Sequence, residues 1–257
     1  MTLGFVGTGT IAAAIVEGLC LTPDAGPIIV SPRNADLAAD LAARFANVRI
    51  AASNQAVLDD SDTVMLAVRP QIADDVLRAL RFRPDHKVVS LIATVSLDYL
   101  RGVVAPAAEV IRAVPLPATA RRQGPTAVYP PDPAIVALFD TLGTAVALDN
   151  EGEFDAFSAT TAVMAAYFAF AGTVTNWMEC NGIAAATARA FVGQMFEGLA
   201  GAASAHPERS FAALADEHQT RGGLNEQIFR AISRDGQLVD LDQALDGVLA
   251  RLRAAHA

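Results

Sequence analysis

The sequence predicts an α/β domain followed by an all-α domain. Through the first half of the chain, short apolar runs alternate with helical stretches, which is typical of a mostly parallel sheet with helices on both faces. A glycine-rich turn follows the first apolar run directly. Beyond about residue 149 the strand pattern ends and long helical segments remain. We therefore expect one domain at residues 1–149 and a second at residues 150–257.

The expected strands are continuous apolar runs, because strands buried on both faces carry few polar residues. They are Thr2–Val6, Pro27–Val30, Val48–Ile50, Thr63–Val68, Lys87–Ile92 and Glu109–Ala113, with Thr126–Tyr129 and Ala145–Leu148 as candidates for two more. The helices between them show apolar residues at helical spacing. They are Thr10–Leu21, Asp36–Phe45, Asn54–Leu58, Ile72–Leu80 and a helix that opens at Ser96–Arg101.

The second domain is expected to contain helices and no strand. The helical segments are Phe154–Asn181, Ala184–Ala205, Ser210–His218, Asn225–Ser233 and Leu241–Ala255. Ser210 and Asp240 are suitable N-cap residues, and Gly182 is suitable for a helix end. The alanine-rich Ala184–Ala205 segment can approach another helix closely, which suits a dimer interface. High helix propensity alone explains it equally well.

Gly7, Gly9 and Ala12 form a GxGxxA motif between the first strand and the first helix. The first glycine permits a tight turn, the second lets backbone N–H groups approach a pyrophosphate, and the small third residue lets the helix pack on the strand. The helix N-terminus adds unpaired N–H groups that favour an anion. The motif predicts a dinucleotide site at Gly7, Thr8, Gly9, Thr10 and Ile11. The alternative is a glycine-rich turn that binds no nucleotide.

The end of the second strand distinguishes between the two nicotinamide cofactors. An acidic residue there would hold the ribose hydroxyls of NAD(H), but here the strand is followed by Ser31, Pro32, Arg33 and Asn34. Arg33 can form a charge-assisted fork to a 2′-phosphate, and Ser31 and Asn34 can add hydrogen bonds. We therefore expect NADP(H) rather than NAD(H). The alternative for Arg33 is a solvated surface arginine.

Residues after other strands complete the expected cofactor site, because open α/β sheets bind ligands at the carboxyl ends of their strands. The segment from Ala67 through Val68 and Arg69 to Pro70 follows the fourth strand. Ala93 follows the fifth strand, and we expect it to contact the cofactor as well. Asn54 begins a helix near the same edge, where it is either an adenosine contact or a plain N-cap.

Composition narrows the function classes. The formal net charge is −9, which disfavours nucleic acid and anionic membranes as partners. Two cysteines, Cys20 and Cys180, make neither a disulfide framework nor a zinc site, and the four histidines show no ligand spacing. We therefore expect no metal. The first residues form a core strand without a basic leader region, so we expect a cytoplasmic protein.

The segment Ser158–Met178 contains no charged residue and is long enough to span a membrane. It carries several hydroxyl and amide side chains, and acidic residues flank both of its ends. We therefore expect a helix that is buried on most sides, in a core or in a subunit interface, and no membrane span.

Six blocks occur in order along the chain: LGFVGTGTIAAAIVEGL, SPRN, SDTVMLAVRPQ, VVSLIATVSLDYL, VIRAVPLPA and TRGGLNEQ. In order and spacing they resemble the pyrroline-5-carboxylate reductases over nearly the whole chain. The resemblance implies an N-terminal Rossmann domain, a helical domain that forms an intertwined homodimer or higher homo-oligomer, and NADPH-dependent reduction of a cyclic imino acid.

The resemblance also implies a substrate loop at Thr220-Arg221-Gly222-Gly223-Leu224-Asn225. The Gly-Gly pair of the family is intact, whereas the family's threonine falls on Asn225 and its proline on Arg221. We expect a substrate carboxylate on the backbone N–H groups of Gly223, Leu224 and Asn225, as at other helix N-termini. The Asn225 side chain would orient the imine, with help from Thr220. Arg221 could contact an additional acidic group of the substrate. The alternative for Gly222-Gly223 is a flexible turn between helices.

Departures from the family pattern leave other functions open. The block Val114-Pro115-Leu116-Pro117 is one residue shorter than the family's Met-Pro-Asn-Thr-Pro and lacks its asparagine. Only Ala166 and Tyr167 remain of the family's Gly-Ser-Gly-Pro-Ala-Tyr stretch. One alternative is a related imine or carbonyl reductase with another substrate. The other is a non-catalytic NADP-binding regulatory protein.

Overall fold

The computed structural model describes residues 1–23, 25–234 and 236–256. Its contacts divide the chain into two compact units. The first unit comprises Met1–Thr161 together with the chain from Leu249 on, and the second comprises Ala162–Val248. The expected division into domains at residue 149 stays a prediction.

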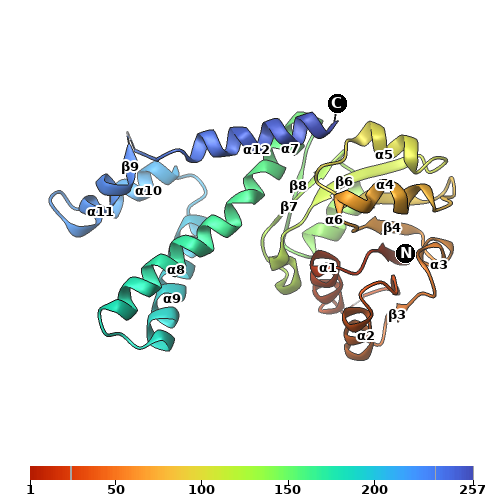
Figure 1. Cartoon of the computed structure of the whole chain (residues 1–257), viewed down its shortest axis with the longest axis horizontal. Helices are drawn as coiled ribbons and strands as arrows, with labels where there is room; N and C mark the ends of the chain where they lie inside the picture. Colours follow the sequence, from red (N-terminus) through yellow and green to blue (C-terminus); the bar gives the residue numbers. More distant parts are fainter. Residues whose placement is uncertain (24, 235, 257) are drawn as a thin grey trace. The chain divides into compact units, whose positions relative to one another are not determined.

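Within the described residues, eight strands of the first unit form one sheet in the order β3-β2-β1-β4-β5-β6-β7-β8 (Figure 1). The strands are β1 (Leu3–Val6), β2 (Ile28–Val30), β3 (Val48–Ile50), β4 (Thr63–Leu66), β5 (Lys87–Ser90), β6 (Glu109–Val114), β7 (Pro125–Tyr129) and β8 (Thr144–Ala147). Neighbouring strands are parallel except β6 and β7, which are antiparallel. The predicted mostly parallel sheet is confirmed.

Helices cover both faces of this sheet (Figure 1). One face buries apolar side chains of α1 (Thr10–Cys20), α2 (Ala35–Arg44) and α6 (Pro133–Asp140), among them Ile15, Leu41 and Phe139. The other face buries side chains of α3 (Asn54–Asp59), α4 (Pro70–Arg78) and α5 (Leu97–Val103). Burial of these faces from water is the main force that holds the three layers together.

Two helical elements of this unit were absent from the sequence-based expectation. One is α6, which crosses between the parallel strands β7 and β8. The other is the short 3-10 helix η1 (Pro117–Arg121). Gly18 of α1 lies against η1, because a Cβ added there would come within 2.2 Å of the Thr119 carbonyl oxygen.

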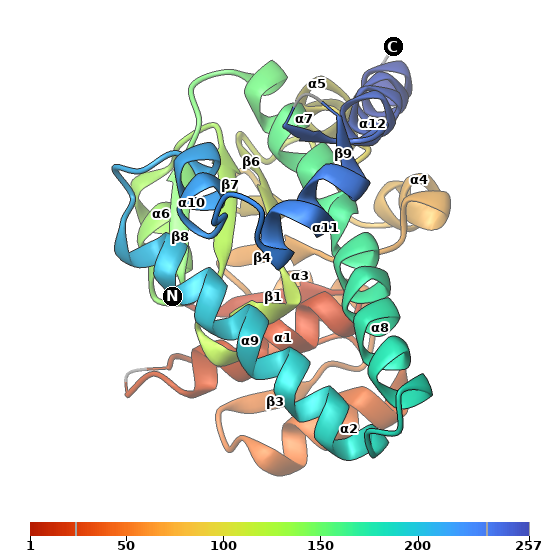
Figure 2. The ribbon, with the colours of Figure 1, turned by 90° about the vertical axis from the view of Figure 1, so that its left-hand side faces the viewer.

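The second unit is helical, as expected. Its helices are α8 (Met164–Cys180), α9 (Ala185–Ala205), α10 (Phe211–Glu217), α11 (Leu224–Ile232) and the first part of α12 (Leu241–His256). Helices α8 and α9 lie side by side (Figure 2). In the chain, α7 (Glu151–Thr160) and the 3-10 turn η2 (Thr161–Val163) lead into α8.

One expectation for this half of the chain was wrong, and one of the two alternatives for another does not apply. A short antiparallel pair of strands is present, β9 (Ser233–Arg234) and β10 (Gln237–Leu238), although no strand was expected. The segment Ser158–Met178 is not a core helix within one chain, since α8 contains no buried residue. The helical stretch Glu151–Cys180 is long and apolar enough to cross a membrane by length and composition alone. Its expected place in a subunit interface stays open.

Candidate functional site

Several of the predicted cofactor residues come together at one edge of the sheet, where parallel strands end side by side. Val6 of β1 pairs with Leu66 of β4, which pairs with Ser90 of β5. The Ser31 N–H, just after β2, donates to the Phe5 carbonyl at 3.0 Å. The loops after β1, β2, β4 and β5 therefore start at the same level. The strand order reverses between β1 and β4, which is where sheets of this kind bind ligands.

Gly7 and Gly9 serve different purposes in the loop after β1. Gly7 has a φ of +98°, and a Cβ there would lie 2.6 Å from the Ala67 carbonyl oxygen. The protein itself therefore requires a glycine at this position. A Cβ on Gly9 would meet nothing within 4 Å, although Gly9 is the N-cap of α1. This open space at a helix N-terminus fits the pyrophosphate of a dinucleotide.

Thr8, Ser31 and Asn34 hold the glycine loop by hydrogen bonds. The Ser31 side chain is buried, and its hydroxyl accepts from the Gly7 N–H at 3.1 Å. The Thr8 hydroxyl donates to the Ser31 carbonyl at 2.8 Å. Asn34 donates from Nδ2 to the Thr8 carbonyl at 3.1 Å. Ser31 and Asn34, which we expected to contact a 2′-phosphate, thus use these groups to fix the loop.

Arg33 is exposed between these two residues. Among the residues that the structure describes, it makes no hydrogen bond or ion pair, so its guanidinium is available to a phosphate. Arg69 is also exposed and is the N-cap of α4, with Pro70 as the first helical residue. Asn54 is the first residue of α3, and the N-cap is Ser53, whose hydroxyl accepts from the Ala56 N–H at 3.1 Å. The plain N-cap interpretation of Asn54 is therefore wrong.

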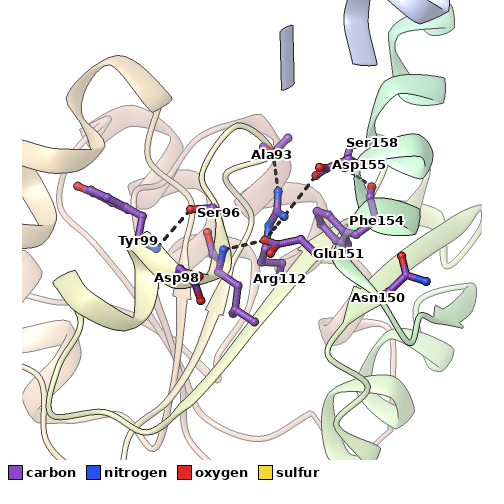
Figure 3. Close-up of polar contacts among 12 residues, drawn as sticks. Ala93, Ser96, Asp98, Tyr99, Arg112, Asn150, Glu151, Phe154, Asp155 and Ser158 are labelled. Carbon is purple, nitrogen blue, oxygen red and sulfur yellow. Dashed lines mark hydrogen bonds and ion pairs between the residues drawn. The ribbon is translucent and has the colours of Figure 1, made fainter. Parts of the chain in front are cut away.

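A buried arginine that the sequence analysis did not single out lies next to this edge (Figure 3). The Arg112 side chain is fully buried in β6, which places it beside Ser90 in the neighbouring strand. Its Nη2 donates to the Ala93 carbonyl at 2.9 Å, and its Nη1 donates to Glu151 Oε1 at 2.6 Å. The guanidinium carbon lies 4.3 Å from the centre of the Phe154 ring. The signal in the sequence is a charged residue with apolar neighbours on both sides within a strand.

Helices α4 and α5 are joined by a hydrogen bond between Tyr99 and Asp74. The Tyr99 hydroxyl donates to Asp74 Oδ1, which also accepts from Arg78 Nε at 2.7 Å. The hydrogen bond from Tyr99 lowers the pKa of Asp74, and the nearby Arg78 charge lowers it further. Burial, together with the hydrogen bond to Asp74, raises the pKa of Tyr99. At neutral pH the pair is therefore a carboxylate that accepts from a neutral phenol.

The predicted substrate residues lie in the second unit, at the N-terminus of α11. Gly222 has a φ of +74°, and a Cβ on Gly223 would lie 2.8 Å from the Thr220 carbonyl oxygen. The Gly223 N–H donates to that carbonyl at 2.7 Å, so this predicted donor is used inside the turn. Leu224 and Asn225 form the first turn of α11, where N–H groups lack partners within the helix. The Gly222-Gly223 segment is therefore a tight turn whose backbone conformation requires the two glycines.

Asn225 borders an apolar groove of about 740 Å³ in this unit. Its Nδ2 donates to the His218 carbonyl at 2.8 Å. The other side chains that line the groove are mostly apolar, among them Tyr167, Phe196, Leu199, Phe211 and Leu214. Asn225 and His218 are therefore polar groups in a largely apolar surface.

Glu226 provides an internal carboxylate at the same turn. Its Oε2 accepts from the Gly222 N–H at 2.6 Å, and its Oε1 accepts from Arg230 Nη2 at 2.6 Å. Negative charge is favourable in the first turn of a helix, so this contact stabilises α11. It also places a carboxylate beside the proposed position of the substrate carboxylate.

Comparison with known proteins supports both halves of this description. Residues 2–94 match the family model described as "NADP oxidoreductase coenzyme F420-dependent". Residues 151–254 match the model for pyrroline-5-carboxylate reductase dimerisation. The pyrroline-5-carboxylate reductase of Pseudomonas aeruginosa is 27% identical over 260 residues, which cover 97% of this chain and 94% of that protein.

Solved structures agree. The pyrroline-5-carboxylate reductase of Streptococcus pyogenes has a TM-score of 0.85 at 25% identity, over 99% of this chain and 98% of that one. Pyrroline carboxylate reductase of Plasmodium falciparum, solved with NADP bound, has a TM-score of 0.81 at 16% identity, over 100% and 98% of the two chains. An Aspergillus terreus reductive aminase shares the fold, with a TM-score of 0.58 at 15% identity, over 99% of this chain and 86% of that one.

The glycine loop on a parallel sheet, followed by a helical dimerisation domain, defines an oxidoreductase of the class that reduces C=N bonds. Within that class, the chain belongs to the pyrroline-5-carboxylate reductase family. The family resemblance inferred from the sequence is confirmed.

Proposed function

We propose that the protein reduces 1-pyrroline-5-carboxylate to proline with NADPH. The observation that carries the proposal is the open space at Gly9, ahead of α1, in a chain that also holds the tight Gly222-Gly223 turn ahead of α11. The N-terminus of α1 can receive a pyrophosphate, and the N-terminus of α11 can receive a carboxylate. The named relatives of Pseudomonas aeruginosa and Streptococcus pyogenes, which match nearly the whole chain, support this choice of substrate.

NADPH, when bound, supplies the hydride, and the residues of this chain bind and orient the two reactants. The α1 N-terminus beside Gly9 binds the pyrophosphate, and Arg33 forms a charge-assisted contact with the 2′-phosphate. The first-turn N–H groups of Leu224 and Asn225 bind the substrate carboxylate. A protonated cyclic imine is already electrophilic, so positioning contributes more here than an acid–base pair.

The direct test is NADPH oxidation by the purified protein after addition of 1-pyrroline-5-carboxylate. We expect turnover, with proline as the product. Tight NADPH binding without turnover would remove this substrate assignment. A panel of cyclic imines and keto acids would then separate a reductase of another substrate from a non-catalytic NADP-binding protein.

Cofactor choice is tested by Arg33→Ser. Loss of a charge-assisted hydrogen bond should raise the KM for NADPH by about tenfold or more and leave the KM for NADH nearly unchanged. The matched control is Arg49→Ser, which removes an exposed arginine of β3 that pairs with Asp60 at 2.6 Å. An Arg33 variant that retains its preference for NADPH would refute the assignment of the 2′-phosphate to Arg33.

A second candidate function, reduction of an imine without a carboxylate, is favoured by Glu226. Its carboxylate already accepts from the Gly222 N–H and would repel an anionic substrate at the same turn. If so, Glu226→Gln should improve turnover of 1-pyrroline-5-carboxylate and leave neutral cyclic imines unaffected. Equal effects on both substrates would remove this candidate.

We further propose a homodimer through the helical unit, which the matched dimerisation model supports. Helices α8 and α9 expose large apolar side chains, including Phe168 at 70%, Trp177 at 66% and Phe191 at 61%. Apolar surfaces of this kind mark protein interfaces. The expected cytoplasmic location and the absence of nucleic-acid and membrane partners stay predictions.

A further inference from the structure

The loop between β5 and α5, residues 91–96, is tied down at two points by one pair of charged side chains (Figure 3). Arg112 Nη2 donates to the Ala93 carbonyl at 2.9 Å. Arg112 Nη1 donates to Glu151 Oε1 at 2.6 Å, and the same oxygen accepts from the Leu97 N–H at 2.7 Å. The pair therefore holds both the middle of the loop and the start of α5.

The pair is itself held rigidly. The Arg112 side chain is fully buried, lies over the Phe154 ring and approaches Asp155 Oδ1 at 3.4 Å. Glu151 and Asp155 are one turn apart on α7. The planar guanidinium donates in two directions at once, toward Ala93 and toward α7, which a lysine cannot reproduce.

The position of this loop relative to the cofactor follows from the strand order β2-β1-β4-β5. Arg33 follows β2, and the open space at Gly9 follows β1. The adenosine end of a dinucleotide therefore lies over the β1 and β2 side of the sheet. The remaining half of the cofactor extends across β4 toward β5, because dinucleotides bind across the point where the strand order reverses. The loop that contains Ala93 therefore borders the nicotinamide end.

We propose that Arg112 is a positioning residue, which acts with Glu151 to set the loop around Ala93 for the nicotinamide half of NADPH. This inference rests on the proposed function. The inference extends that function by giving a role in cofactor binding to two side chains that lie outside the glycine loop and outside the substrate turn.

The test compares two ligands that share the adenosine end. The dissociation constants of NADPH and of adenosine 2′,5′-bisphosphate are measured by calorimetry for the wild-type protein, Glu151→Ala, Glu151→Gln and Arg112→Lys. We expect Glu151→Ala and Arg112→Lys to weaken NADPH binding by about tenfold, and adenosine 2′,5′-bisphosphate binding by less than about twofold. Glu151→Gln keeps an oxygen that can accept from the Leu97 N–H, so it should recover part of the loss.

Lys87→Met is the matched control, because Lys87 lies at the opposite end of β5 and pairs with Asp132 at 2.6 Å. It should lower the Tm and leave both dissociation constants unchanged. Equal weakening of both ligands by the Glu151 variants, or no weakening of either, would overturn the positioning role. A wild-type protein that binds adenosine 2′,5′-bisphosphate but not NADPH, or neither ligand, would refute the proposed function itself, and the inference with it.

Discussion

At the scale of single residues, the two glycines of the loop after β1 have different structural roles. The GxGxxA pattern predicts a tight turn at Gly7 and close approach of a ligand at Gly9, and only Gly7 has a positive φ and a backbone neighbour too close for a Cβ. Ser31 was predicted as a ligand contact from its position after β2, whereas its hydroxyl accepts from the Gly7 N–H. Sequence position placed these residues at one edge of the sheet but did not reveal which of their side chains turn inward.

The two glycines can be separated by matched variants. Gly7→Ala places a Cβ against the Ala67 carbonyl in a strained conformation and should lower the free energy of unfolding by about 2 kcal/mol or more. Gly9→Ala places a methyl group in open space, so stability should stay near that of the wild type while NADPH binding weakens. Urea unfolding and NADPH titration measure the two effects. Wild-type affinity for NADPH in Gly9→Ala would contradict the assignment of the pyrophosphate to the open space at Gly9.

At the scale of elements, His86 joins α3 to the turn ahead of β5. Its Nδ1 accepts from the Arg83 N–H at 3.0 Å, and its Nε2 lies 3.0 Å from the Leu58 carbonyl. A carbonyl only accepts, so the neutral ring carries its proton on Nε2. Burial, and then the nearby Arg83 charge, lower the pKa of His86 below its ordinary value of 6.5.

The pH dependence of stability follows from this shift. The unfolded chain binds a proton on His86 near pH 6.5, and the folded protein binds it only at lower pH. The contribution of His86 is therefore complete above pH 6.5 and is lost as the pH falls toward the folded pKa. Urea unfolding at about pH 7.5 and about pH 5.5 should show a smaller loss of stability for His86→Gln than for the wild type. Equal losses would contradict the shift.

The elements that the sequence analysis missed have physical reasons. The α6 segment is apolar nearly throughout, so it lacks the spacing that distinguishes a helix from a strand. Its start was nevertheless marked, because Asp132 caps it and Pro133 is its first residue. β9 and β10 are two residues long each, too short for an alternating pattern. Arg112 was passed over because its partners Glu151 and Asp155 are distant in sequence.

At the scale of the whole molecule, the apolar character of α8 was recognised from the sequence, and of its two expected places, a core and a subunit interface, the core does not apply within a single chain. Core and interface helices have similar compositions, and only the contacts distinguish them. Tyr167, Phe168, Phe170 and Trp177 are all exposed. A chain of net charge −9 needs a specific apolar surface to self-associate, since the charges repel.

Charge placed on this surface should break the proposed dimer. Phe168→Glu should shift the protein to monomers in sedimentation equilibrium, because a carboxylate in an apolar interface loses its hydration. Leu21→Glu is the control, since Leu21 is 59% exposed at the end of α1, outside the helical unit. The monomer should still bind NADPH through the first unit. An unchanged assembly for Phe168→Glu would place the interface elsewhere.

The buried cluster of Arg112, Glu151 and Asp155 limits which substitutions this part of the sequence tolerates. Arg112 faces two carboxylates, so a mutation that removes the arginine takes away the positive charge that pairs with Glu151 and Asp155 beside the sheet. Breaking a buried ion pair from one side costs about 3–5 kcal/mol, a large part of the roughly 5–15 kcal/mol that stabilises a typical domain. Replacing any one of the three residues alone is therefore costly, and we expect substitutions at these positions to occur together.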